Sequence, residues 1–250
     1  MNIILPNNVF TRVLSSCFPE ETKIKFLPSS QITQKIENDN SSIGLIPVMD
    51  LLNHKDLFVS NKFGISFESS LCNSYIYYNS QENSINRIAL AGDISSQEVI
   101  LSKILFKEVY GSDIEIEIIT DMNKSKNKNL LLVGDDNFID DKFTKGISFS
   151  EIFVDALSIP LVNYLFASTN REELENLIKK LNDVDNLFYS TIENGNFDKK
   201  FSTASEEYIK KNISSFIFKF DEQDREGVEQ ILRLPYFHGI TKDIVELKLI

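Results

Sequence analysis

The alternation of short apolar runs with amphipathic segments constrains this fold more than any other feature of the sequence. Runs rich in β-branched or aromatic residues are typical of strands and cover residues 1–5, 23–27 and 42–48. Residues 28–40 lie between the last two runs and predict a helix, in which Ile32 and Ile36 form an apolar stripe. Strand, helix and strand in this order predict a parallel sheet with right-handed crossovers.

The same pattern recurs farther along the chain. Residues 85–92 predict a strand, and residues 95–111 predict a helix that ends at Gly111. Residues 114–120 alternate as in a half-buried strand, whereas 129–136 are nearly continuously apolar, as in a central strand covered on both faces. These segments predict a second α/β unit.

The last part of the chain is mainly helical. We expect helices over 170–194, 203–214 and 221–239, and a strand over 215–220. Because a first unit of about 80 residues is marginal alone, the simplest architecture builds one lobe from both ends of the chain. We therefore expect an α/β fold of two lobes with a cleft between them. The first lobe would comprise residues 1–80 and 166–250, and the inserted second lobe residues 81–165.

Charge and hydropathy narrow the function. The formal net charge of −11 argues against a general role on nucleic acid, since phosphate binding needs clustered Lys and Arg. No stretch approaches the roughly 20 apolar residues of a membrane helix. The start of the chain also has no basic segment followed by a long apolar run. We expect a cytoplasmic protein with no membrane partner, for which a homodimer remains open.

Metal sites and the common catalytic motifs have little support. Cys17 and Cys72 are the only cysteines, have no metal-binding spacing, and are expected as reduced, partly buried thiols. His54 and His238 are the only histidines, and both are expected as caps or surface residues. The sequence contains no G-x-S-x-G, Walker A or G-x-G-x-x-G motif. We expect neither a metal nor a cofactor.

The turn before the helix at 95–111 has two explanations. Ser95 and Glu98 have the S-x-x-E spacing of a capping box, which explains both residues. Alternatively, the helix N-terminus and the hydroxyls of Ser95 and Ser96 bind a ligand carboxylate.

Two further segments can carry a site. Gly134 follows a buried strand and places Asp135 at the carboxyl edge of the sheet, where ligands tend to bind, although a solvated turn explains it equally well. Asn73 and Ser74 begin the predicted strand 74–78. That strand either crosses between the lobes or forms a hairpin edge with paired tyrosines.

In order along the chain, these segments resemble the chorismate dehydratase family of the futalosine pathway of menaquinone biosynthesis. SSIGLIPVMDLL resembles the family's D-x-G-L-V-P-V-x-E-Y, and GISFESSLCNSYIYYN resembles G-I-S-S-x-G-x-V-x-S-V-x-L-F-S. IALAGDISSQEVILSKILFKEVYG resembles I-A-L-D-x-S-S-R-T-S-V-x-L-L-K-I-L-L. LLLVGDDNF, LSIPLVNYLFAS and FIFKFDEQDREGVEQI resemble later family motifs, so the likeness covers nearly the whole chain.

The resemblance implies a type 2 periplasmic-binding-protein-like fold and a carbon–oxygen lyase. The family removes water from chorismate, a small anionic molecule, to give 3-enolpyruvylbenzoate without a metal or cofactor. Ser74 matches its catalytic serine, and Asn7 or Asn8 would supply its catalytic asparagine if the N-terminal turn is shifted, with Asn8 the expected one. The expected substrate-binding residues are Asn73, Ser95, Ser96, Arg12, Gly134 and Asp135.

The sequence departs from the family pattern around the expected cleft. Phe10 occupies the family's asparagine position, and Val13 its proline position. Gln97 and Glu98 replace an arginine and a threonine, and the chain has no tryptophan. Because these changes remove anion-binding and catalytic groups, three hypotheses remain: a divergent chorismate dehydratase, a related small-acid lyase, and a non-catalytic binder of a small carboxylic acid.

Overall fold

Seven strands form the larger of two sheets. They are β1 (Asn2–Pro6), β2 (Lys23–Leu27), β3 (Ser42–Pro47), β4 (Phe58–Phe67), β10 (Leu161–Ser168), β11 (Phe216–Lys219) and β12 (Lys248–Leu249). Their order is β11-β4-β10-β3-β1-β2, with β12 beside β4. The computed structural model describes residues 1–81, 85–195, 197 and 201–250.

Five strands form the second sheet. They are β5 (Ser74–Tyr77), β6 (Arg87–Gly92), β7 (Glu115–Ile118), β8 (Leu130–Val133) and β9 (Ile147–Ser148), in the order β7-β6-β8-β5-β9. β8 lies between β6 and β5 and is buried at every position, which confirms the prediction of a central strand. β5 is also an inner strand, so the alternative of a hairpin edge at 74–78 is wrong.

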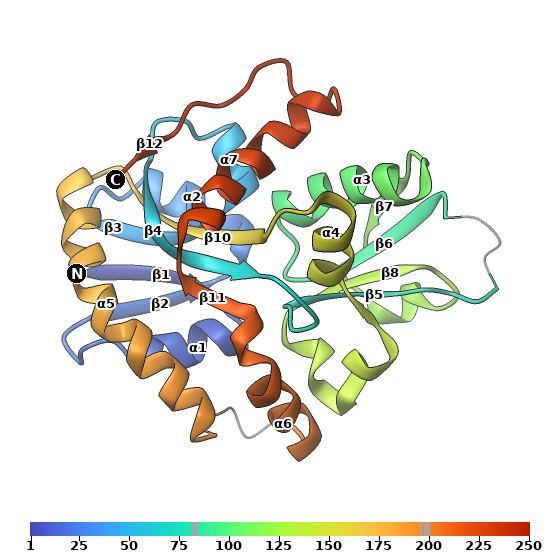
Figure 1. Cartoon of the computed structure of the whole chain (residues 1–250), viewed down its shortest axis with the longest axis horizontal. Coiled ribbons are helices and arrows are strands. Elements are labelled where there is room, and N and C mark those ends of the chain that lie inside the picture. Colours follow the sequence, from blue (N-terminus) through green and yellow to red (C-terminus); the bar gives the residue numbers. More distant parts are fainter. Residues whose placement is uncertain (82–84, 196, 198–200) are drawn as a thin grey trace.

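Helices surround both sheets (Figure 1). The α-helices are α1 (Val9–Ser16), α2 (Ser29–Glu37), α3 (Ser96–Tyr110), α4 (Phe149–Leu157), α5 (Arg171–Glu193), α6 (Thr203–Asn212) and α7 (Glu222–Phe237). The short 3₁₀ helices are η1 (Val48–Leu52), η2 (Met122–Ser125), η3 (Asp135–Asn137), η4 (Ile139–Lys145) and η5 (Ile213–Ser215). α2 packs against β3 and β1, α5 against β4 and β10, and α7 against β10.

The predicted parallel unit at the start of the chain is confirmed. β1 pairs in parallel with both β2 and β3, so the connection through α2 crosses over β1. Ile32 and Ile36 are fully buried on the face of α2 that meets this sheet. Gly111 ends α3 in the left-handed conformation, with φ of 64°, as the sequence predicts.

The chain crosses between the sheets twice, from β4 to β5 and from α4 to β10 (Figure 1). We call the seven-stranded sheet with α1, α2, α5, α6 and α7 the first lobe, and the five-stranded sheet with α3 and α4 the second lobe. The predicted first lobe, residues 1–80 and 166–250, includes β5, but β5 belongs to the five-stranded sheet of the second lobe. The predicted second lobe, residues 81–165, includes the start of β10, but β10 belongs to the seven-stranded sheet of the first lobe. β10 begins early because its apolar run pairs with both β3 and β4.

The longer elements that the sequence analysis does not predict are α1, β4, α4 and β10. The signal for α1 was available, because Asn8 can cap a helix in which Val9 and Val13 share one face. β10 is buried at all positions and lacks the alternation that identifies a half-buried strand.

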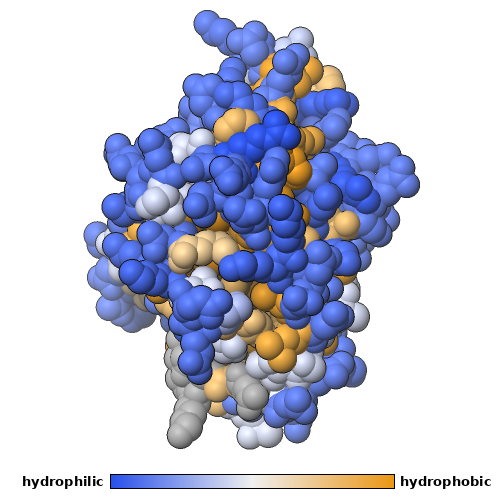
Figure 2. Space-filling model, turned by 90° about the vertical axis from the view of Figure 1, so that its left-hand side faces the viewer, coloured by the Kyte–Doolittle hydropathy of each residue, from blue (hydrophilic) through white to orange (hydrophobic). Residues whose placement is uncertain are grey.

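The surface of the first lobe is mostly hydrophilic. Figure 2 shows this face, where hydrophobic side chains emerge only in small patches between polar ones. Among the residues that the structure describes, none of the helices has the length and apolarity needed to span a membrane.

Candidate functional site

Two Gly-Asp turns end neighbouring parallel strands of the second lobe. Gly92 ends β6 and Gly134 follows β8, with positive φ angles of 96° and 99°. A Cβ at Gly92 would lie 1.9 Å from the carbonyl oxygen of Val133, so this close approach of two backbones requires glycine. Asp93 and Asp135 therefore follow the turns at the same carboxyl edge of the sheet.

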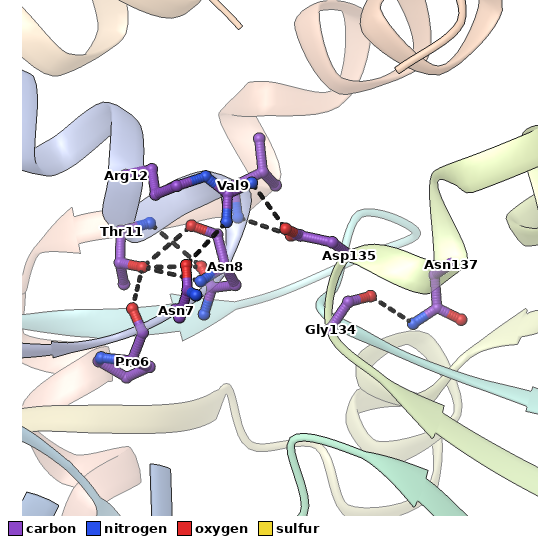
Figure 3. A network of polar contacts seen from close by, with 9 residues as sticks. All are labelled: Pro6, Asn7, Asn8, Val9, Thr11, Arg12, Gly134, Asp135 and Asn137. Carbon is purple, nitrogen blue, oxygen red and sulfur yellow. Dashed lines mark hydrogen bonds and ion pairs between the residues drawn. The ribbon is translucent and has the colours of Figure 1, made fainter. Parts of the chain in front are cut away.

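Asp135 reaches across to the start of α1 in the first lobe (Figure 3). Its Oδ1 accepts a hydrogen bond from the backbone N–H of Val9 at 2.7 Å, and its Oδ2 accepts from Arg12 Nη2 at 2.6 Å. Arg12 also donates to Asn7 Oδ1 at 3.0 Å. Charge-assisted bonds of this kind are strong, and the helix dipole favours a carboxylate at this position. The structure thus brings together the predicted site residues Arg12 and Asp135, which bind each other.

Asp93 makes the equivalent contact with the start of α2. Its Oδ1 accepts from the backbone N–H of Ser29 at 2.8 Å, and its Oδ2 accepts from the Ser29 hydroxyl at 2.6 Å. Burial raises the pKa of Asp93, and the charge of nearby Asp135 acts in the same direction, whereas the Ser29 bonds oppose the shift. Asp93 was not among the predicted site residues. The repeated Gly-Asp pair was the only sequence signal for it.

A third contact runs in the opposite direction. Asp50, in η1 of the first lobe, accepts from the hydroxyl of Ser96 at 2.5 Å and from the hydroxyl of Thr33. Next to it, the Gln97 side chain accepts from a backbone N–H of η1 at 3.1 Å and donates to the carbonyl of Val162 at 3.0 Å. Ser96, predicted to bind a substrate, therefore binds the other lobe.

The capping box at the start of α3 is confirmed. Glu98 Oε2 accepts from the backbone N–H of Ser95 at 2.9 Å and from its hydroxyl at 2.7 Å. Glu98 is 3% exposed, and burial raises its pKa to about 7. We call the inter-lobe contacts of Asp50, Asp93 and Asp135 the seam. Glu98 lies beside the seam, close to Asp93.

Asn73 and Ser74 lie in a buried polar centre between the sheets. The Ser74 hydroxyl is 3.4 Å from the Sγ of Cys72. Asn73 donates to the Tyr164 hydroxyl at 3.4 Å and accepts from Asn163 at 3.4 Å, both long contacts. Within the described part of the chain, Oδ1 of Asn163 has no hydrogen-bond partner. Ser74, the predicted catalytic serine, is 1% exposed.

Asn8, the other predicted catalytic residue, caps α1 (Figure 3). Its Oδ1 accepts from the backbone N–H of Thr11 at 3.1 Å, and the Thr11 hydroxyl accepts from the N–H of Asn8 at 3.2 Å. Asn8 is 3% exposed, so its side-chain oxygen faces the helix rather than a substrate.

Phe10 packs between the two lobes at the start of α1, next to the seam. Its ring stacks on Phe216 at 5.3 Å and meets Phe67 edge-on at 5.4 Å, both from the first lobe. It also meets Phe138 of the second lobe edge-on at 6.1 Å. The expected cleft is therefore occupied here by aromatic side chains from both lobes.

α6 joins the lobes a second time. The hydroxyls of Ser202 and Ser205 donate to Asp141 in η4 of the second lobe, and these bonds lower the pKa of Asp141. The ring of Phe143 stacks on Tyr208 of α6, with 4.1 Å between the ring centres. This α6–η4 contact had no signal in the local sequence, because its partners lie far apart along the chain.

The described ranges contain no group of three or more His, Cys, Asp and Glu residues able to hold a metal ion. His54 and His238 each pair with a glutamate, at 2.7 Å and 3.1 Å. Cys17 and Cys72 are both buried and unbridged, and burial raises the pKa of each thiol.

No protein-family model and no curated protein sequence matches the chain. Among solved structures, a protein from Archaeoglobus fulgidus has a TM-score of 0.68 at 12% identity, over 96% of this chain and 98% of that one. An ABC transporter from Parabacteroides distasonis has a TM-score of 0.61 at 11% identity, over 98% and 95%.

A Candida albicans gene product with the generic periplasmic-binding-protein fold has a TM-score of 0.55 at 9% identity, over 97% of this chain and 91% of that one. At such identities the likeness concerns the fold alone. The chain has the two-lobe, periplasmic-binding-protein-like α/β fold that the sequence predicted.

Proposed function

We propose that this protein is a non-catalytic binder of a small carboxylic acid, which it holds between its lobes. The proposal rests on the set of hydrogen-bond donors that surrounds the Asp135 carboxylate. One backbone N–H at the start of α1 and the Arg12 guanidinium both donate to it. This arrangement suits any carboxylate, and the same donors are the ones that a ligand carboxylate would use.

The state of the predicted catalytic residues favours binding without chemistry. Asn8 is engaged in a helix cap, and the Ser74 hydroxyl lies against a buried thiol. Phe10 fills the place where the resemblance expects a catalytic asparagine. None of the three presents a free polar group to a substrate that would enter beside Arg12.

A ligand screen tests this proposal. The purified protein is heated with acetate, lactate, pyruvate, succinate, malate, benzoate or chorismate, with the matching amides as controls. An acid present at 100 times its Kd stabilises by about 2.7 kcal/mol, which raises Tm by about 5–10 °C in a chain of this size.

A matched pair of variants locates the site. Arg12→Ala should weaken binding of the active acid at least about tenfold, because it removes the charged donor. Arg87→Ala removes an exposed arginine that pairs with Glu115 at the far edge of the second sheet, and should leave the affinity unchanged. The proposal fails if no acid raises Tm, or if Arg12→Ala binds as well as the wild type.

A chorismate dehydratase-like lyase is the second hypothesis. It is favoured by Glu98, a buried carboxyl whose pKa of about 7 suits proton transfer near neutral pH. Incubation with chorismate would then give 3-enolpyruvylbenzoate. Absence of this product, while an active dehydratase forms it in parallel, refutes the hypothesis.

A further inference from the structure

Three carboxylates join the two lobes at the seam. Asp93 and Asp135 extend from the second lobe to the starts of α2 and α1. Asp50 extends from the first lobe to the start of α3, through Ser96. Each carboxylate accepts hydrogen bonds at both of its oxygens.

Asp93 and Asp135 are equivalent in position as well as in chemistry. Each follows a glycine with positive φ at the end of a strand, and the two strands are parallel neighbours. Each then binds the first backbone N–H of a helix in the other lobe together with one side-chain donor, from Ser29 or from Arg12. A ligand that closes two lobes makes contacts of this kind with both of them.

We propose that Asp93 and Asp135 are built-in ligands, which hold the lobes closed when no other molecule is bound. An incoming carboxylate must displace at least one of them, so the contact is autoinhibitory. The inferred closed state depends only on observed contacts between the lobes, whereas the competition with an external acid also rests on the proposed function.

Other contacts limit how far the lobes separate once the two aspartates are released. The α6–η4 contact through Asp141 lies in a different part of the interface and does not involve the seam. The contact between Asp50 and Ser96 also remains. Phe10 neighbours Val9 at the start of α1, so its edge-on contact with Phe138 is lost as the lobes open. We therefore expect a hinge-like opening at the starts of α1 and α2, with the lobes still joined at α6.

Small-angle X-ray scattering and amide exchange on the full chain test this proposal without any ligand. A compact chain of 250 residues has a radius of gyration of about 18 Å. The wild type should have this value, and the double variant Asp93→Ala/Asp135→Ala should exceed it. The amide protons of Val9 and Ser29 should exchange at least about tenfold faster in the double variant.

Two further variants make the test decisive. Asp136→Ala removes the exposed neighbouring carboxylate and should match the wild type in both measurements. Asp135→Leu keeps the side-chain shape without an acceptor if the alanine variant fails to fold, and should speed exchange at Val9 alone. Faster exchange without a larger radius of gyration overturns the proposal, because the aspartates would then only cap helices. Unchanged exchange overturns it as well.

Comparing the affinity of an acid for the wild type and for a variant at position 135 tests this inference separately from the proposed function. An acid that binds the wild type should bind Asp135→Leu about tenfold more tightly, since no side-chain acceptor at position 135 competes with it. If no acid binds either protein, the proposed function fails while the scattering result still decides the closed state. If an acid binds both proteins equally, the autoinhibitory contact is refuted and the proposed function survives.

Discussion

Truncating Phe10 to alanine tests whether the two lobes pack tightly against each other at the start of α1. The ring is 1% exposed and contacts three other rings, at centre-to-centre distances between 5.3 and 6.1 Å. Loss of a buried phenylalanine costs about 3–5 kcal/mol of the free energy of unfolding. In a chain of this length that corresponds to a fall in Tm of roughly 10 °C.

Urea unfolding followed by circular dichroism measures this loss. The control is Phe237→Ala, because that ring is 69% exposed and its removal should change the free energy of unfolding by no more than about 0.5 kcal/mol. A double-mutant cycle of Phe10→Ala with Phe138→Ala should give a coupling of about 1 kcal/mol across the lobes. A loss below about 1 kcal/mol for Phe10→Ala would refute tight packing between the lobes at this place.

Three other changes probe the groups around the seam. Burial raises the pKa of Glu98 from 4.5 to about 7. Because the folded state holds that proton more tightly, the free energy of unfolding of the wild type should fall by about 3 kcal/mol as pH rises from 4.5 through about 7. In urea titrations, Glu98→Gln should lose this pH dependence. A double-mutant cycle of Arg12→Ala and Asp135→Ala should give about 1–2 kcal/mol of coupling that shrinks in 1 M salt, and no coupling would contradict the ion pair. Gly92→Ala should lower the free energy of unfolding by more than about 3 kcal/mol, because its Cβ would lie 1.9 Å from a backbone carbonyl oxygen. Gly111→Ala should lose only about 1 kcal/mol, because its Cβ would point into open space. Equal losses for the two glycines would show that close approach is not the cause.

Local sequence patterns predicted the parts of the fold that depend on neighbours along the chain. The stripe of Ile32 and Ile36 predicted α2, and the spacing of Ser95 and Glu98 predicted the capping box, because both depend on residues three or four positions apart. Gly111 ended α3 for an equally local reason.

The seam could not be predicted in the same way. Asp93 and Ser29 are 64 positions apart, and Asp135 and Val9 are 126 apart, so no local pattern relates them. From the sequence alone, Asp135 is explained equally well as a ligand-binding residue and as a solvated turn residue. In the structure it is an acceptor for the other lobe, an outcome that requires knowing how the two sheets face each other.

The proposed mode of binding is tested most directly by nuclear magnetic resonance titration of the ¹⁵N-labelled protein with the acid that raises Tm. If the acid takes the place of the built-in carboxylates, the largest shifts should fall on the amides of Val9 and Ser29 and on the Arg12 side chain. Shifts centred elsewhere, such as on the cavity of about 580 Å³ between α3 and the end of α7, would contradict the account. So would saturation with acid that leaves Val9 and Ser29 unmoved.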